Sequence, residues 1–171
     1  DALGDFIAFP TYYKTTKQLS FWENSQFTEV NDGSQTHPFT VAEALAIIED
    51  MTNGTTASEP VYVKGIVTDI SEISTTYYNA TYLIADNETA EDVDKITVFR
   101  GFYLGGQYFV GSSTIKVKDE VIVYGKLQKY FKDEKVTPEI ASGNKLYSLN
   151  GNTTAPDAFP FKIAVTTQPT K

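Results

Sequence analysis

The sequence predicts a mainly β domain with one amphipathic helix ahead of its strands. Only one stretch repeats apolar residues at the three- and four-residue spacing of a helix, whereas most later segments alternate apolar and polar side chains or are rich in β-branched residues. The chain has 171 residues, of which 41% are hydrophobic and 13% aromatic. This is the usual length of one domain, and it suffices to bury a core without disulfide bonds or a metal.

Composition and charge exclude several classes of protein. The chain carries 14 basic and 22 acidic side chains, a net charge of −8, which argues against binding nucleic acid through bulk electrostatics. It has no cysteine, so disulfides, thiolate catalysis and cysteine-ligated zinc are excluded. The sequence begins at Asp1 without a methionine or an export signal, which suggests that an upstream signal or lipid anchor has been removed. No apolar run is long enough to cross a membrane.

The domain is expected to have an extension at each end. Residues 1–35 hold short aromatic segments and close with the turn-like run Asn31–Gln35, so we place a boundary near residue 35. This N-terminal extension is too short to fold alone, and we expect its aromatic side chains to pack on the domain that follows. Residues 36–150 then form the domain, and residues 151–171 form a C-terminal extension.

The single helix begins after Pro38. Thr40 and Glu43 have the spacing of a capping box, and the pair Asn53–Gly54 is expected to end the helix. Five apolar residues recur between these limits at steps of three and four and form one stripe that must be buried: Val41, Ala44, Leu45, Ile48 and Met51.

Five strands are expected after the helix. They span residues 61–70, 77–85, 95–103 and 120–130, with the last formed by residues 136–140 together with 146–149. The longest gap in the series, Leu104–Asp119, follows the third strand. Five strands with a longer connection after the third follow the order of an OB-fold, a small Greek-key barrel. A β-sandwich also has short strands at this spacing and remains the alternative.

Seven segments carry a resemblance to known modules: Pro38–Leu45, Val61–Val67, Ala80–Asp86, Val98–Leu104, Val121–Leu127, Thr137–Glu139 and Gly143–Leu149. Together they resemble the OB-fold modules of exported proteins and predicted lipoproteins from anaerobic gut Gram-negative bacteria. They are also similar to OB modules attached to some secreted sugar-nonspecific nucleases. The resemblance covers residues 36–150 and implies a five-stranded barrel of nucleic-acid-binding-like type. The resemblance implies no catalytic residues that could be assigned to positions in this sequence.

Aromatic and basic residues on the expected second and third strands and the adjoining loops are the candidate ligand-binding residues. OB-folds bind ligands there, and aromatic rings offer flat surfaces on which bases or sugar rings stack. The candidates are Tyr78, Tyr82, Arg100, Tyr103, Lys126, Tyr130 and Lys132. The alternative is that most of these rings fill the barrel, that Arg100 pairs with a local carboxylate, and that the lysines form a solvated face.

The acidic loop after the second strand is a weak candidate for calcium. Asp86, Glu88, Asp92 and Asp94 supply oxygen ligands at short spacing, but the loop lacks the pattern of an EF-hand, and a solvated loop is the favoured interpretation. No cofactor is expected. His37 is the only histidine, which argues against a Ser-His-Asp triad and against a histidine-rich metal site. We therefore expect no enzymatic activity.

The sequence thus predicts an exported, non-catalytic OB-fold binding module that recognises an extended ligand on its strand 2–3 face. The acidic charge favours an oligosaccharide or a protein over single-stranded nucleic acid. The expected location is the cell surface or periplasm of a Gram-negative bacterium, as the resemblance implies. The competing interpretation is a structural or accessory domain of a surface lipoprotein assembly, with no small ligand of its own.

Overall fold

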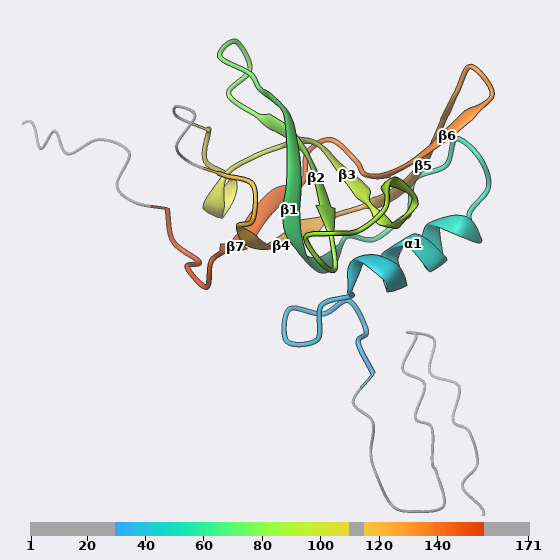
Figure 1. The fold of residues 1–171 in the computed structure, drawn as a ribbon, viewed down its shortest axis with the longest axis horizontal. Helices are drawn as coiled ribbons and strands as arrows, with labels where there is room; N and C mark the ends of the chain where they lie inside the picture. Colours follow the sequence, from blue (N-terminus) through green and yellow to red (C-terminus); the bar gives the residue numbers. More distant parts are fainter. Residues whose placement is uncertain (1–29, 110–114, 156–171) are drawn as a thin grey trace, which may run out of the picture.

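The described chain folds into one curled β-sheet with a helix against its side. The structure is a computed structural model, and it describes residues 30–109 and 115–155. The sheet contains β1 (Val61–Ile73), β2 (Ala80–Ala85), β3 (Ile96–Gly101), β4 (Glu120–Gly125), β5 (Leu127–Lys132), β6 (Lys135–Ile140) and β7 (Lys145–Leu149) (Figure 1). The strand order is β5-β6-β3-β2-β1-β4-β7. All neighbours are antiparallel except β3 and β6, and the predicted mainly β class is confirmed.

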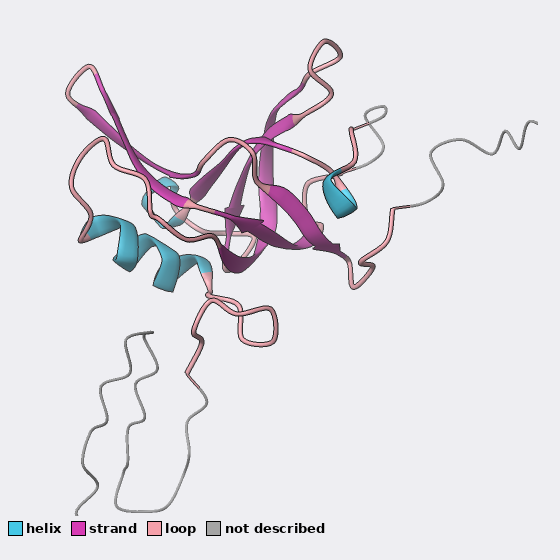
Figure 2. Cartoon of the chain, turned by 180° about the vertical axis from the view of Figure 1, so that it is seen from behind, coloured by secondary structure: helices cyan, strands magenta, loops and turns pink. Residues whose placement is uncertain are grey.

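The β7 end of the sheet curls back toward the end of β3, which pairs with β6 on its other side. β6 pairs in parallel with β3 at Thr97 and Val98, while β7 forms a parallel bridge from Lys145 to Phe102, which directly follows β3. The Phe102 amide donates to the Asn144 carbonyl at 2.9 Å on the same side. The strand order therefore describes an almost closed, barrel-like sheet (Figure 2).

Helix α1 (Val41–Glu49) begins where the sequence predicts. Thr40 Oγ1 accepts a hydrogen bond from the Glu43 amide at 3.1 Å, and the Glu43 carboxylate accepts one from the Thr40 amide at 2.8 Å. The predicted capping box is therefore confirmed. The residues of the predicted stripe that α1 buries completely are Val41, Ala44 and Ile48.

The helix ends earlier than predicted. Its last residue is Glu49, whereas the sequence places the end at Asn53–Gly54. Gly54 belongs instead to a segment that runs along the outer edge of β5, because its amide donates to the Lys129 carbonyl at 2.8 Å. This pairing covers an edge of the sheet that would otherwise be open.

Two of the predicted strands are each divided. The predicted strand 120–130 is seen as β4 and β5, and the predicted fifth strand is seen as β6 and β7, so the sheet has seven strands rather than five. The reason is that β4 pairs with β1 and β7, whereas β5 pairs with β6. The chain must change direction at Gly125 and Lys126 to satisfy both sets of partners.

A buried asparagine holds this bend. Asn144 Nδ2 donates to the carbonyls of Phe99 at 2.9 Å, Ala141 at 2.8 Å and Ile140 at 3.2 Å, and thus ties the β6–β7 turn to β3. Gly125 lies against the same side chain. A Cβ atom at Gly125 would be 2.5 Å from Asn144 Cβ and 2.6 Å from Ile140 Cγ2, so glycine is required at this position.

The N-terminal end of the described chain is bonded to the sheet. The Tyr62 amide donates to the Gly33 carbonyl at 2.9 Å, so the boundary predicted near residue 35 falls within a loop that packs on the domain. Gly33 itself has a left-handed backbone, with φ of +72°, and lies against the Phe39 ring. The predicted packing of residues 1–29 and most of the C-terminal extension, residues 156–171, lie outside the described residues.

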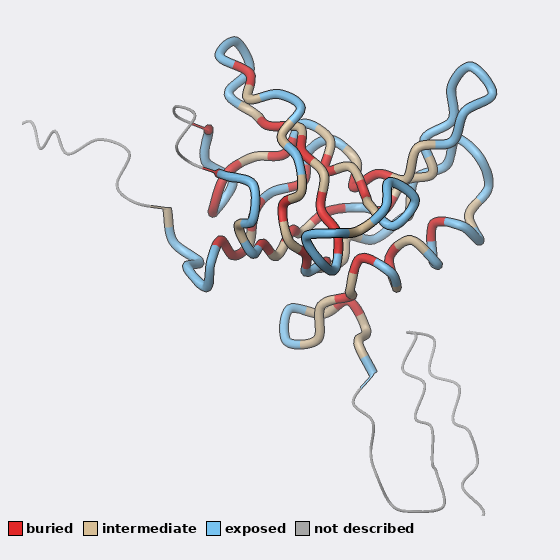
Figure 3. Tube along the Cα trace, viewed as in Figure 1, coloured by how far each residue is buried: buried red, intermediate tan, exposed pale blue. Residues whose placement is uncertain are grey.

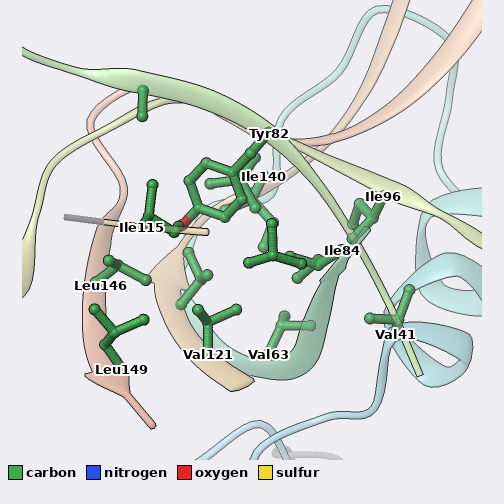
Figure 4. Packing of buried hydrophobic residues seen from close by; sticks show 14 of the residues in the cluster. Val41, Val63, Tyr82, Ile84, Ile96, Ile115, Val121, Ile140, Leu146 and Leu149 are labelled. Atoms are coloured by element: carbon green, nitrogen blue, oxygen red, sulfur yellow. The ribbon is translucent and has the colours of Figure 1, made fainter. Parts of the chain in front are cut away.

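The core lies inside the curled sheet and under α1. Buried and exposed residues alternate along the strands (Figure 3), as expected when one face of each strand points inward. Figure 4 shows Tyr82 at the centre of this core, with its hydroxyl directed toward Ile115. Tyr82 is completely buried, and burial raises the pKa of its hydroxyl far above the usual value. No hydrogen-bond partner of this hydroxyl is present among the described residues.

We expect Tyr82→Phe to raise the free energy of unfolding by about 1 kcal/mol, because it removes a buried polar atom that makes no hydrogen bond and keeps the ring. Urea denaturation measures the change. Tyr62→Phe is the control: Tyr62 lies on the outer face of β1, and its substitution should change stability by less than about 0.5 kcal/mol. A loss of stability in Tyr82→Phe would contradict the expectation.

Candidate ligand-binding surface

The outer face of β2, β3 and β6 is a continuous surface between two projecting arms. Because Leu83 pairs with Thr97 and Thr97 pairs with Glu139, these three residues form one row across the strands. The β1–β2 loop and the β5–β6 hairpin project on the same side of the sheet in both views (Figures 1 and 2). The exposed side chains of this face and of the two arms are therefore candidates for contact with an extended ligand.

A bulge in the β2–β3 pairing exposes two neighbouring side chains of β3. Phe99 points outward in the regular alternation, so Arg100 would point inward, but the register shifts between Ala80 and Tyr82. Arg100 adopts a left-handed backbone, with φ of +48°, and its amide donates to Thr81 Oγ1 at 3.2 Å. Bulges commonly redirect a side chain in this way, and such strain is often found at functional sites.

Arg100 is exposed and held over an aromatic ring. Its Cζ lies 4.9 Å from the centre of the Phe99 ring, a cation–π contact that leaves the edge of the guanidinium open. In the described part of the chain no carboxylate forms an ion pair with Arg100, in contrast to the local pairing considered above. Arg100 is the only arginine of the protein, and its exposed side chain is a candidate for contact with a ligand.

A chain of aromatic rings joins the β1–β2 arm to the connection that follows β3. The centres of the Tyr78 and Tyr108 rings are 5.6 Å apart, and those of Tyr108 and Phe102 are 6.1 Å apart. Tyr77, Tyr78 and Tyr108 are 66%, 47% and 61% exposed, so two loops that meet here expose three aromatic side chains. The Phe109 amide donates to the Tyr78 carbonyl at 2.8 Å and fixes the arm. Tyr77 and Tyr108 were not among the predicted site residues.

The β5–β6 arm presents Tyr130 and Lys132 on the same side as Glu139. Opposed residues of an antiparallel pair share a face, and Gln128 is opposite Glu139 while Tyr130 is opposite Thr137. Both Tyr130 and Lys132 are exposed, as the site prediction requires. Lys126 is also exposed, but it lies at the β4–β5 junction rather than on the arm.

Two of the predicted site residues are buried, and their assignment to a ligand surface is wrong. Tyr82 alternates with Ala80 and Ile84 along β2 and points into the barrel. Tyr103 packs edge-to-face against Phe109, with ring centres 5.2 Å apart, and burial raises the pKa of its hydroxyl. Both rings therefore stabilise the core, which is the alternative role considered for the aromatic residues.

Glu139 was missed. Only 7% of its surface is exposed, and burial raises the pKa of its carboxyl group. No described residue forms an ion pair or a hydrogen bond with the side-chain carboxyl group of Glu139. The sequence contains no signal for the burial of Glu139, because an acidic residue after Pro138 in a lysine-rich segment is typical of a solvated hairpin.

Asp86, one of the weak metal candidates, binds the start of α1 instead. Its carboxylate accepts hydrogen bonds from the amides of Val41 at 2.7 Å and Ala42 at 2.9 Å. These amides belong to the first turn, where a helix has no acceptors of its own and favours negative charge. Asp86 therefore has a structural role that joins β2 to the helix.

The other acidic residues of this loop do not converge. Glu88 pairs with Lys118 at 2.6 Å, and Asp92 pairs with Lys95 at 2.7 Å, which lowers the pKa of Asp92. Asp94 lies in the short 3-10 turn Asp92–Asp94 and is exposed. Within residues 30–109 and 115–155, no three histidine or carboxylate side chains are grouped as a metal site.

Comparisons with known proteins assign no family to this surface. Searches of the chain against protein-family models and against curated proteins find no match. No helix in the described part of the chain has both the length and the hydropathy needed to cross a membrane.

Proposed function

We propose that this protein is an exported, non-catalytic OB-fold module that binds an oligosaccharide chain across the outer face of β2, β3 and β6. In this interpretation β4 and β5 are the two halves of the fourth OB strand, and β6 and β7 are the halves of the fifth. The parallel pairing of β3 with β6 and the bridge from Phe102 to β7 support this interpretation. The β1–β2 and β5–β6 arms then correspond to the loops with which OB-folds hold ligands.

The observation that carries the proposal is the exposed Arg100 near the end of β3, together with the exposed rings of Tyr78, Tyr108 and Tyr130. Sugar hydroxyls can accept hydrogen bonds from a guanidinium such as that of Arg100. Sugar rings also present apolar faces that pack on exposed tyrosines such as Tyr78 and Tyr108. A net charge of −8 opposes a polyphosphate chain.

The cellular location of the module is part of the same proposal. Its resemblance to modules of exported proteins and lipoproteins supports a location at the cell surface or in the periplasm of a Gram-negative bacterium. A protein partner remains the second candidate ligand, because exposed aromatic side chains next to a single arginine are also typical of protein interfaces.

The test is a glycan array probed with the full chain, followed by titration of the best-binding oligosaccharide. We expect Tyr78→Ala to weaken binding on the order of tenfold, corresponding to the loss of one stacking contact, and Arg100→Ala to have an effect of similar size. Tyr78→Phe keeps the ring and should bind within about twofold of the unchanged protein. Tyr147→Ala is a control outside the proposed surface, since Tyr147 packs on Tyr62 on another face.

The outcomes separate the candidate functions. Absence of binding to any glycan would overturn the proposal and favour the accessory-domain interpretation. Binding of a labelled single-stranded oligonucleotide that weakens steeply with salt would instead support the nucleic-acid interpretation. Equal losses in Tyr78→Ala and Tyr147→Ala would show that the ligand binds elsewhere.

A further inference from the structure

A second surface, separate from the proposed glycan face, is a groove between α1 and the β5–β6 arm. Its volume is about 460 Å³, and the helix contributes Ala42, Leu45 and Ile48 to its wall. Val136 and Pro138 of β6 and Val93 of the β2–β3 loop complete the apolar lining. Figure 1 shows the helix and the arm that flank it.

The groove exposes apolar side chains that a folded domain ordinarily covers. Val93 is 82% exposed and Val136 is 37% exposed, and both line the groove. Exposed apolar surface in a concave setting marks an interaction site. The groove is therefore suited to an apolar segment.

The charge around the groove is acidic. Glu49 and Asp94 line it directly, and residues 40–99 carry 11 acidic and only 2 basic side chains. Lys129 is the only basic residue in the lining, and its ammonium group is held at the end of α1, where it donates to the Glu49 carbonyl at 2.7 Å. An occupant that combines apolar and basic side chains would complement this surface.

We propose that residues 11–22 of the same chain dock into this groove. The segment contains Lys14 and Lys17, no acidic residue, and five large apolar or aromatic side chains: Tyr12, Tyr13, Leu19, Phe21 and Trp22. It therefore has the composition that the groove requires. This proposal does not depend on the glycan-binding function.

The chain can reach the groove from the point where its described part begins. Asn31 Nδ2 donates to Glu43 Oε2 at 3.0 Å, so residue 31 lies beside the first turn of α1. The nine residues of α1 span about 14 Å, whereas the eight residues 23–30 can span up to about 26 Å when extended. The intervening chain is long enough to place residues 11–22 anywhere along the helix.

Disulfide trapping in the full chain tests this docking. The protein has no cysteine, so an engineered pair has no competitor. Leu19→Cys, Phe21→Cys and Trp22→Cys are each combined with Val93→Cys, whose exposed position tolerates the change, and disulfide formation is followed under mild oxidation. The control pairs use Thr89→Cys, an exposed position in the same β2–β3 loop as Val93 that does not line the groove. The control measures collisions that the tether alone permits.

We expect at least one pair with Val93→Cys to form an intramolecular disulfide on the order of tenfold faster than its Thr89→Cys counterpart. Lys14→Glu combined with Lys17→Glu should reduce this advantage, whereas Thr15→Ala combined with Thr16→Ala should leave it unchanged. Equal rates for the groove and control pairs would overturn the proposal. A disulfide that forms only between two chains would also overturn it, because a second copy would then occupy the groove.

Discussion

Asn144→Ala is expected to lower the free energy of unfolding by about 3 kcal/mol, because it leaves buried carbonyl groups without their donor. Asn144 is only 2% exposed, and its Nδ2 atom donates to three carbonyls in β3 and in the β6–β7 turn. A loss of this size is a large share of the stability of a domain of this length. Urea denaturation, with the slope of the transition compared between variants, measures it.

Asn152→Ala is the matched control for this prediction. Asn152 is exposed, and its side chain donates only one long hydrogen bond, to the Leu149 carbonyl at 3.4 Å. Its substitution should cost less than about 0.5 kcal/mol. If the two variants were equally stable, Asn144 would not hold the turn to β3 as the geometry indicates.

Gly125→Ala is expected to cost about 2–3 kcal/mol through overpacking. The added Cβ atom would approach Asn144 Cβ and Ile140 Cγ2 to 2.5 and 2.6 Å, and both neighbours are buried. The backbone of Gly125 lies within β4, so the expected loss arises from the clash rather than from backbone strain.

Comparison with Gly54→Ala separates the stability lost through a steric clash from the stability lost through backbone strain. Nothing lies within 4 Å of a Cβ atom at Gly54, but its φ of +80° disfavours a side chain, so the expected loss is about 1 kcal/mol. Thermal or urea denaturation of both variants should rank Gly125→Ala as the more destabilised. The reverse order would contradict the packing described for the β4–β5 bend.

Elements governed by local interactions could be predicted from the sequence. The start of α1 depends on Thr40 and Glu43, three residues apart, and its capping box is found as predicted. The five predicted strand segments are also all present, because the alternation of side chains is a local property. The divisions that make seven strands depend on which partners β4 and β5 take across the sheet, which is not local information.

The candidate site also depends on contacts between distant segments, which the sequence does not reveal. The two faces of β2 could be separated from the sequence, but both carry apolar residues, so the inward direction of Tyr82 could not be chosen. Exposure of Arg100 depends on a bulge that involves Thr81, and Glu139 is buried where β6 pairs with both β3 and β5. The role of Asp86 joins residues 45 positions apart in the chain. Each of these features arises from contacts between distant segments.

The β5–β6 arm is anchored at its base, and its tip projects away from the barrel (Figure 1). Leu127 and Ile140 are buried at its base, whereas the arm ends in a turn built from Asp133 and Glu134, both with positive φ. Because the side-chain period of a strand is two, inserting or removing opposed pairs of residues near the tip would leave the base in register. The arm can therefore vary in length from one homologue to another while the barrel beneath it stays the same.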